Sequence, residues 1–186
     1  GRELAKSVEA PSIFAAPMEI EDPDRTAREL ARILKMDLET LRGKLSERRE
    51  FVWVKRKVTP EEATAIQALG LPGIHFVTEN KRTYPNGELA AHVLGYAGID
   101  EVGLDGVEFT YDREIRGEES TVFVYRDARG RTYEWAQRPV TRGHDLVLTL
   151  DATIQFHTER ELREAVRRTG ARSGIAIVLD PKTGVG

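Results

Sequence analysis

The sequence contains no cysteine and no long apolar run. Without cysteine among its 186 residues, the chain cannot form disulfides, use a thiol nucleophile or bind zinc through thiolates, and this absence fits an oxidising or a reducing compartment equally well. No stretch approaches the roughly 20 apolar residues of a membrane-spanning helix, and residues 1–17 lack the apolar centre of a signal peptide. We therefore expect any membrane anchor to lie outside this sequence.

A dominant charge is also lacking. The 28 basic and 31 acidic residues are interspersed and give a net charge of −3, so the chain has neither a basic stripe for nucleic acid nor an acidic tail. With 40% hydrophobic residues, the composition is typical of a globular chain that buries one modest core or two small ones. We expect no nucleic-acid partner.

The usual patterns of metal binding and acyl transfer are missing as well. The four histidines show no His-x-x-x-His or His-x-His spacing, so we expect neither a metal nor a cofactor. The triplet Lys182-Thr183-Gly184 matches one signature of penicillin-interacting enzymes, but it follows Asp180-Pro181 and is typical of a turn. No serine is followed three positions later by lysine. Without that nucleophile, we predict that this chain is not itself an enzyme.

Helix caps and turn residues outline an α+β chain. Helix N-caps are predicted at Asp22, Asp37, Thr59 and Asp151. The helices that follow them are expected over residues 23–36, 38–45, 60–69 and 152–169, with a shorter helix over 88–94. Strands are expected over residues 4–15 (one or two edge strands), 51–58, 74–78, 144–150 and 174–180. A hairpin is predicted around Asp127 and Gly130, where Gly130 can adopt a positive φ.

Glycines recur densely between residues 75 and 120. Five of them would permit sharp turns and close approach of backbones: Gly87, Gly95, Gly98, Gly103 and Gly106. Four side chains could tie these loops together through charge-assisted hydrogen bonds: Arg82, Tyr84, Asp100 and Glu108.

This region carries a family resemblance. The stretch KRTYPNGELAAHVLGYAGIDEVGLDGVEFTYDREIRG, residues 81–117, closely resembles the N-terminal signature region of class B penicillin-binding proteins, the monofunctional transpeptidases of peptidoglycan synthesis. Other parts of the chain are similar to neighbouring segments of that family in the same order: residues 1–17, 127–131, 145–166 and 173–184. Residues 51–74 look more like the division-specific branch than the elongation branch.

The resemblance implies a domain organisation. We expect an elongated pedestal of antiparallel strands, in which residues 1–20 pair with residues 107–150 and a hairpin covers 121–138. A small α+β head lobe would be inserted as residues 21–106. Residues 151–186 would be the first helix and strand of a truncated transpeptidase domain.

The resemblance also implies a function outside the cytoplasm. The chain would be the non-catalytic scaffold of a D,D-transpeptidase on the periplasmic side of the cytoplasmic membrane, in a parent anchored by a single N-terminal transmembrane helix. Its expected partners are its own transpeptidase domain, a glycan polymerase of the shape, elongation, division and sporulation family, and other division proteins, with a homodimer as a further candidate assembly. The alternative is a free-standing cell-wall hydrolase that uses paired carboxylates such as Asp100 and Glu108.

Structural or partner-interface roles are predicted for a set of residues in these motifs. They are Arg2, Glu3, Arg82, Tyr84, Pro85, Gly87, His92, Gly95, Asp100, Gly103, Gly106, Glu108, Asp127 and Gly130.

Overall fold

The structure, a computed structural model, describes residues 2–117, 122–126, 132–137 and 143–184. The chain divides by its internal contacts into two units. The first, which we call the strand unit, is Lys6–Thr83, and the second contains Gly1–Ala5 and Tyr84–Gly186. These divisions differ from the boundaries expected after residues 20 and 106.

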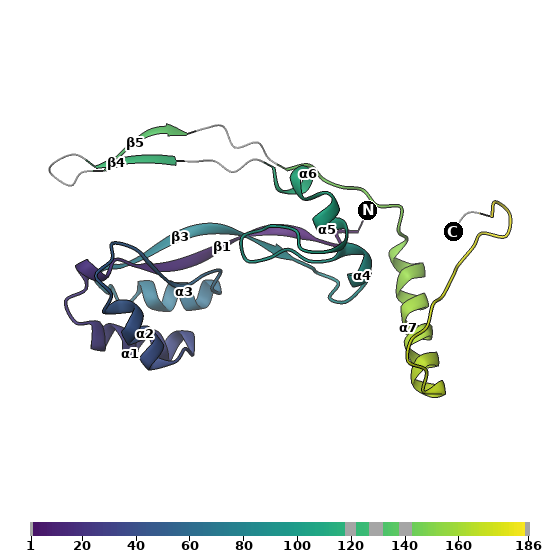
Figure 1. The fold of residues 1–186 in the computed structure, drawn as a ribbon, viewed down its shortest axis with the longest axis horizontal. Helices are drawn as coiled ribbons and strands as arrows, with labels where there is room; N and C mark the ends of the chain where they lie inside the picture. Colours follow the sequence, from purple (N-terminus) through teal and green to yellow (C-terminus); the bar gives the residue numbers. More distant parts are fainter. Residues whose placement is uncertain (1, 118–121, 127–131, 138–142, 185–186) are drawn as a thin grey trace. The chain divides into compact units, whose positions relative to one another are not determined.

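The strand unit is built on a three-stranded antiparallel sheet. Its strands are β1 (Lys6–Ala15), β2 (Val52–Lys55) and β3 (Ile74–Thr83), in the order β2-β1-β3. The β1–β3 pair runs the full ten residues, from Lys6 opposite Thr83 to Ala15 opposite Ile74. Figure 1 shows these two strands as one long twisted ribbon.

The position of β1 corrects two predictions. We expected an edge strand that pairs with residues 107–150, whereas β1 is the central strand and pairs with β2 and β3. Pro11, which suggested an edge position, lies before the stretch of β1 that pairs with β2. Proline removes one backbone donor, and at this point the Pro11 carbonyl still accepts a hydrogen bond from the Val58 amide at 2.8 Å.

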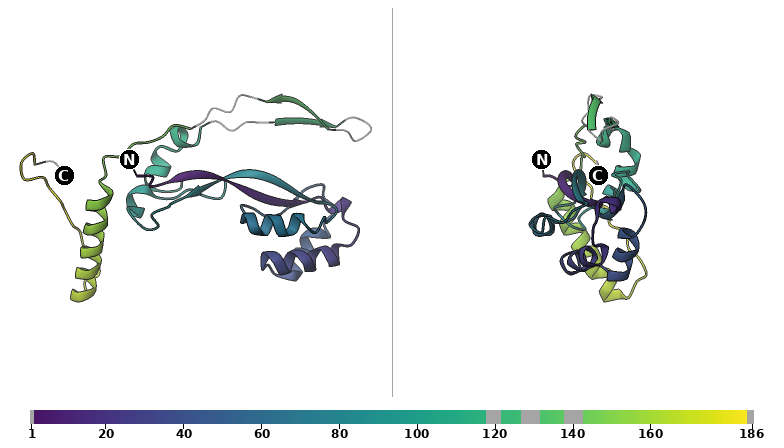
Figure 2. Two further views of the ribbon diagram at one scale, coloured as in Figure 1. Left: turned by 180° about the vertical axis from the view of Figure 1, so that it is seen from behind. Right: turned by 90° about the vertical axis from the view of Figure 1, so that its left-hand side faces the viewer.

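Three capped helices cover one face of this sheet. They are α1 (Pro23–Leu34), α2 (Leu38–Leu45) and α3 (Pro60–Gln67), and a 3-10 turn, η1 (Pro17–Glu19), leads into the first. The predicted N-caps form: Asp22 accepts from Arg25, Asp37 accepts from Thr40, and Thr59 and Glu62 form a capping box. The left view of Figure 2 shows the helices on the same side of β1 and β3.

The core of the strand unit lies between the helices and the sheet. In α1, Ala27, Leu30 and Leu34 recur at helical spacing and are all buried. Their partners in the core come from the other helices, from the strands and from the segment between β2 and α3: Ile13, Ala15, Leu41, Leu45, Val54, Val58 and Ile66.

The second unit contains short helices, a hairpin and one long helix. Its elements are α4 (Ala91–Leu94), α5 (Gly106–Thr110), α6 (Asp112–Arg116), β4 (Val122–Arg126), β5 (Thr132–Gln137) and α7 (Ala152–Thr169). β4 and β5 pair antiparallel, at the place where the sequence predicts a hairpin. The turn between them, with Asp127 and Gly130, lies outside the described residues.

Three predicted strand regions take other conformations. Residues 106–116 form α5 and α6 instead of part of a β pedestal, because Asp105 caps the first of these helices through its side chain. Residues 144–150 and 174–180 have no regular structure, and Val147 and Ile175 are 91% and 89% exposed. A strand needs a neighbouring strand for its backbone groups, and among the described residues no strand pairs with either segment.

Candidate functional site

Residues 84–112, which we call the glycine-rich segment, fold into turns in which backbones touch directly. A Cβ atom on Gly95 would lie 1.8 Å from the carbonyl oxygen of Asp105, and one on Gly103 would lie 2.0 Å from that of Glu108. Both distances are far inside van der Waals contact, so only glycine fits at either position. Gly95 also has φ 71° and ψ −152°, a backbone conformation that is essentially restricted to glycine.

The other predicted glycines divide into two groups. A Cβ on Gly106 would lie 2.5 Å from the Val93 carbonyl oxygen, whereas one on Gly87 would meet nothing within 4 Å. At Gly98, the nearest atom would be a side-chain carbon of Leu104 at 3.3 Å. Close backbone approach therefore occurs at Gly95, Gly103 and Gly106.

Two side chains close the turns of this segment. The Ala97 amide donates to Tyr84 Oη at 3.0 Å, and the Gly103 amide donates to Asp112 Oδ1 at 2.7 Å. Ala97 and Gly103 also face each other in an antiparallel bridge. Tyr84 and Asp112 thus hold opposite sides of one turn. The sequence marked Tyr84 for this role but not Asp112.

The two carboxylates of the hydrolase hypothesis lie in different environments. Glu108 is only 5% exposed, and Asp100 is exposed. General acid–base hydrolysis requires both groups at one site that substrate can reach. This difference gives the hydrolase hypothesis no support.

The remaining candidate residues are distributed over both units. Arg82 lies in β3, where its Nη1 donates to Ser7 Oγ at 3.4 Å. The Glu3 carbonyl accepts a 2.7 Å hydrogen bond from Asn86 Nδ2. Four other candidates are exposed: Arg2, Pro85, Gly87 and His92.

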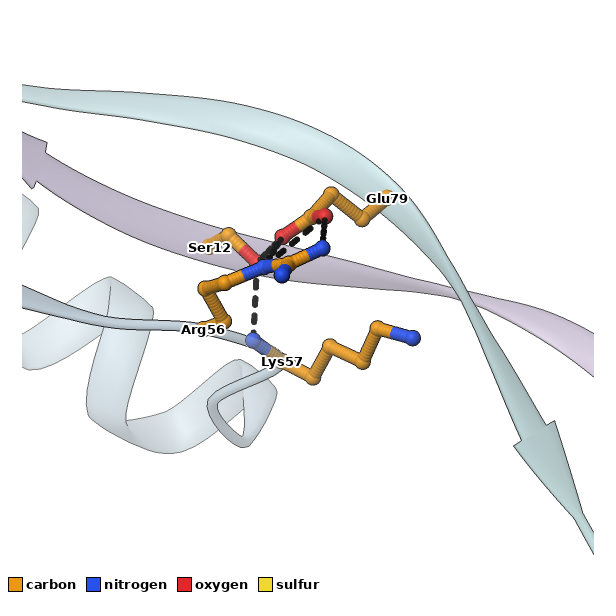
Figure 3. Close-up of polar contacts among 4 residues, drawn as sticks. All are labelled: Ser12, Arg56, Lys57 and Glu79. Carbon is orange, nitrogen blue, oxygen red and sulfur yellow. Dashed lines mark hydrogen bonds and ion pairs between the residues drawn. The ribbon is translucent and has the colours of Figure 1, made fainter. Parts of the chain in front are cut away.

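A polar cluster ties together the chain segments of the strand unit (Figure 3). Ser12 of β1 is fully buried, and its hydroxyl donates to Glu79 of β3 and accepts from the Lys57 amide at 2.7 Å. Arg56 Nε donates to the two Glu79 carboxylate oxygens at 3.1 and 3.0 Å, and a second guanidinium nitrogen also contacts this carboxylate. We call Ser12, Arg56, Lys57 and Glu79 the strand tie.

The strand tie keeps a partly buried carboxylate ionised. Hydrogen bonds from Arg56 hold the pKa of Glu79 below its usual value, and the Ser12 hydroxyl and the positive charges of Arg56 and Lys57 lower it further against the opposing effect of burial. This cluster was not predicted from the sequence, because its members are far apart along the chain. Its one local signal was Ser12, a polar residue within an apolar stretch of strand, since a buried hydroxyl requires partners.

An aromatic group lies next to the strand tie. Phe14 stacks on Phe51 and on His75, with ring centroids 4.8 and 5.2 Å apart, and Trp53 meets Phe14 and Phe51 edge-on. The Arg56 guanidinium lies 5.1 Å from the centre of the Trp53 ring, within cation–π distance. Phe51 is 45% exposed, so part of this aromatic surface is accessible.

Metal-binding and membrane-spanning features are absent from the described part of the chain. No group of three or more His, Asp or Glu side chains is arranged to hold a metal ion there. Among the same residues, no helix has both the length and the apolar character needed to cross a bilayer.

Comparison with known protein families identifies the fold. The sequence profile of the penicillin-binding protein dimerisation domain matches residues 1–148. The chain belongs to this family. Among curated proteins, this penicillin-binding protein domain is 35% identical to a probable peptidoglycan D,D-transpeptidase, PenA of Neisseria meningitidis, and 34% identical to the peptidoglycan D,D-transpeptidase FtsI of Escherichia coli. Each match covers 99% of this chain and 33% of the relative, so the chain spans about a third of their length.

Solved structures of a peptidoglycan synthetase and of a penicillin-binding protein share this fold. A peptidoglycan synthetase from Bifidobacterium adolescentis matches with a TM-score of 0.54 and 26% identity, over 89% of this chain and 36% of that one. A penicillin-binding protein from Helicobacter pylori, solved in complex with MreC, matches with a TM-score of 0.64 and 22% identity, over 88% and 36% of the two chains.

Proposed function

We propose that this chain is the non-catalytic, extracytoplasmic scaffold module of a peptidoglycan D,D-transpeptidase. The observation that carries the proposal is the family match over residues 1–148 in a chain without a Ser-x-x-Lys nucleophile. Its relatives with D,D-transpeptidase in their names are about three times as long as the matched region. In this proposal, α7 and the residues after it begin the transpeptidase domain, and the preceding elements hold that domain away from the membrane.

The glycine-rich segment supports a scaffold role. Direct backbone contacts at Gly95 and Gly103 leave no side-chain rotamers to adjust, so the segment has a well-defined shape. Such a shape suits a part that fixes the direction of the chain or presents a surface to a partner.

Labelling with a fluorescent penicillin tests the scaffold proposal. We expect the full-length protein to form the covalent acyl-enzyme and this chain to remain unlabelled, because the acylated serine requires a Ser-x-x-Lys motif. Labelling of this chain alone would reject the non-catalytic assignment. A folded full-length protein that stays unlabelled would reject the transpeptidase assignment.

We further propose that the module contacts a glycan polymerase of the shape, elongation, division and sporulation family. The candidate contact residues are Arg82 in β3 and Tyr84 in the glycine-rich segment. Arg82→Glu or Tyr84→Ala in the full-length protein should weaken co-purification of the polymerase at least several-fold and leave penicillin labelling nearly unchanged.

A charge reversal elsewhere in the strand unit serves as the control for Arg82→Glu. Arg32 of α1 is 71% exposed, and Arg32→Glu should leave polymerase co-purification intact. Unchanged co-purification with both Arg82→Glu and Tyr84→Ala would reject the partner role of these residues.

A further inference from the structure

A carboxylate on the long helix α7 binds a strained turn of the glycine-rich segment. Ala90 has φ 55° and ψ 24°, the left-handed conformation that is unfavourable for a residue with a Cβ. Its side chain is 3% exposed, and its amide donates to Glu159 Oε1 of α7 at 2.8 Å. A side chain of the helix thus accepts a hydrogen bond from the backbone amide of a turn that lies 69 positions earlier in the sequence.

This hydrogen bond completes the pairing of Ala90. Its carbonyl accepts from the amides of Val93 and Leu94 at 2.9 and 2.8 Å, which starts α4. Its own amide has no acceptor within α4, because the first amides of a helix have no intrahelical partner. Glu159 supplies the acceptor as an ionised group, which makes the hydrogen bond stronger than one to a neutral oxygen.

Neighbouring side chains orient Glu159 and add a second link. Gln155, one turn earlier on α7, donates from Nε2 to the same Glu159 oxygen at 2.8 Å. One turn later, Arg163 lies 3.6 Å from the Glu88 carboxylate, which belongs to the same turn as Ala90. Three successive positions on one face of α7 therefore take part in the contact with the turn.

We propose that Glu159 is a positioning residue that fixes α7 against the glycine-rich segment. Ala90 would keep its left-handed conformation because Glu159 holds its amide, and α7 would keep its direction because the carboxylate is held in return. This inference rests on the proposed function, in which α7 leads into the catalytic domain. The contact would then fix the orientation of the catalytic domain relative to the scaffold.

Hydrogen exchange in the full-length protein tests the positioning role. Glu159→Ala should increase amide exchange at residues 88–94 by about tenfold or more, because it leaves the amide of Ala90 without its acceptor. Glu159→Gln keeps a side-chain oxygen at the same distance from the backbone and should restore most of the protection. Glu161→Ala is the matched control, since Glu161 lies on the same helix, is 65% exposed and forms an ion pair with its neighbour Arg160.

Two results would overturn the inference. One is equal protection of residues 88–94 in Glu159→Ala and the unaltered protein. The other is faster exchange throughout the chain, β1 and β3 included, because that would reflect general destabilisation. Penicillin labelling of the unaltered full-length protein reports the proposed function separately. If that protein stays unlabelled while Glu159→Ala still speeds exchange at residues 88–94, the transpeptidase assignment is rejected and the contact remains in place.

Discussion

The strand unit and the glycine-rich segment are stabilised in different ways. In the strand unit, large apolar side chains such as Leu30, Leu41 and Ile66 are buried between helices and sheet. In the glycine-rich segment, large side chains such as Leu104 and Phe109 are 54% and 65% exposed, and the close contacts are between backbones. Side-chain volume determines packing in the first region, whereas the absence of side chains permits it in the second.

This difference separates two kinds of sensitivity to mutation. A core of aliphatic side chains responds to lost volume and can partly relax around a cavity. A backbone contact made at glycine cannot relax in this way, because the added atom meets a carbonyl group that is itself fixed by the chain. Matched substitutions in the two regions should therefore change the free energy of unfolding by different amounts.

Gly95→Ala should be the most destabilising of these changes. The new methyl group would meet the Asp105 carbonyl at 1.8 Å, and the backbone conformation of Gly95 excludes alanine, for a combined cost of roughly 4 kcal/mol. Urea unfolding and limited proteolysis within the glycine-rich segment would measure this loss. Gly87→Ala is the control, because its Cβ meets nothing within 4 Å and only the positive φ costs about 1 kcal/mol. Equal losses at both positions would refute the role of close approach.

Leu41→Ala should destabilise the strand unit by about 3 kcal/mol, since it removes a fully buried side chain and leaves a cavity. The matched change in the glycine-rich segment, Leu104→Ala, should cost less than about 0.5 kcal/mol, because that side chain is 54% exposed. Free energies of unfolding in urea would compare the two. Similar losses would show that side-chain burial does not distinguish the regions.

Glu79→Gln should weaken the strand tie in a pH-dependent way. Because folding lowers the pKa of Glu79 from its usual value near 4.5, the ionised group stabilises the fold above that value, and this contribution is lost as the pH falls through the lower pKa of the folded state. Glu79→Gln should therefore cost about 2 kcal/mol at neutral pH, and the deficit should narrow below about pH 4. Free energies of unfolding at pH 7 and pH 3 would measure the change.

The control for this pH effect is Glu9→Gln, an exposed position on β1. It should change stability little at either pH. A deficit for Glu79→Gln that stays the same size at pH 7 and pH 3 would contradict the assignment of Glu79 as an ionised member of the strand tie.

Gly43→Ala should have the smallest effect and the opposite sign. Gly43 lies inside α2, and its Cβ would meet no atom within 4 Å. Alanine should therefore raise stability by about 0.5–1 kcal/mol through its higher helix propensity. Thermal unfolding would detect the gain as a higher Tm. A lower Tm would show that backbone contact also matters at a glycine of the strand unit.

Local signals predicted the helices well. The caps at Asp22, Asp37, Thr59 and Asp151 all form, because a cap depends on residues within one turn of the chain. Strands were harder to predict, since a strand requires a partner elsewhere. Residues 174–180 have the composition of a buried strand, but no strand among the described residues pairs with them. β1 pairs with both β2 and β3, whereas we expected it at the edge of a sheet.

The candidate site was predictable in kind but not in its contacts. Dense glycines indicated close backbone approach, and the structure gives the partners at Gly95 and Gly103 as the carbonyls of Asp105 and Glu108. Those partners follow from the path of several turns, which the sequence does not specify. The strand tie was missed for a similar reason, since 67 positions separate Ser12 from Glu79.

The long pairing of β1 with β3 has a consequence for the order of folding. Lys6 and Thr83, at one end of this ladder, are 77 positions apart. Since synthesis adds roughly 5–20 residues per second, β1 emerges roughly 4–15 s before its partner is complete. During that time α1 and α2 can form from local contacts and β2 can pair with Ile13–Ala15, but Ile74 and Phe76 of β3, which pack against the core, have not yet been made. The nascent strand unit therefore presents uncovered apolar residues to chaperones until β3 has been made.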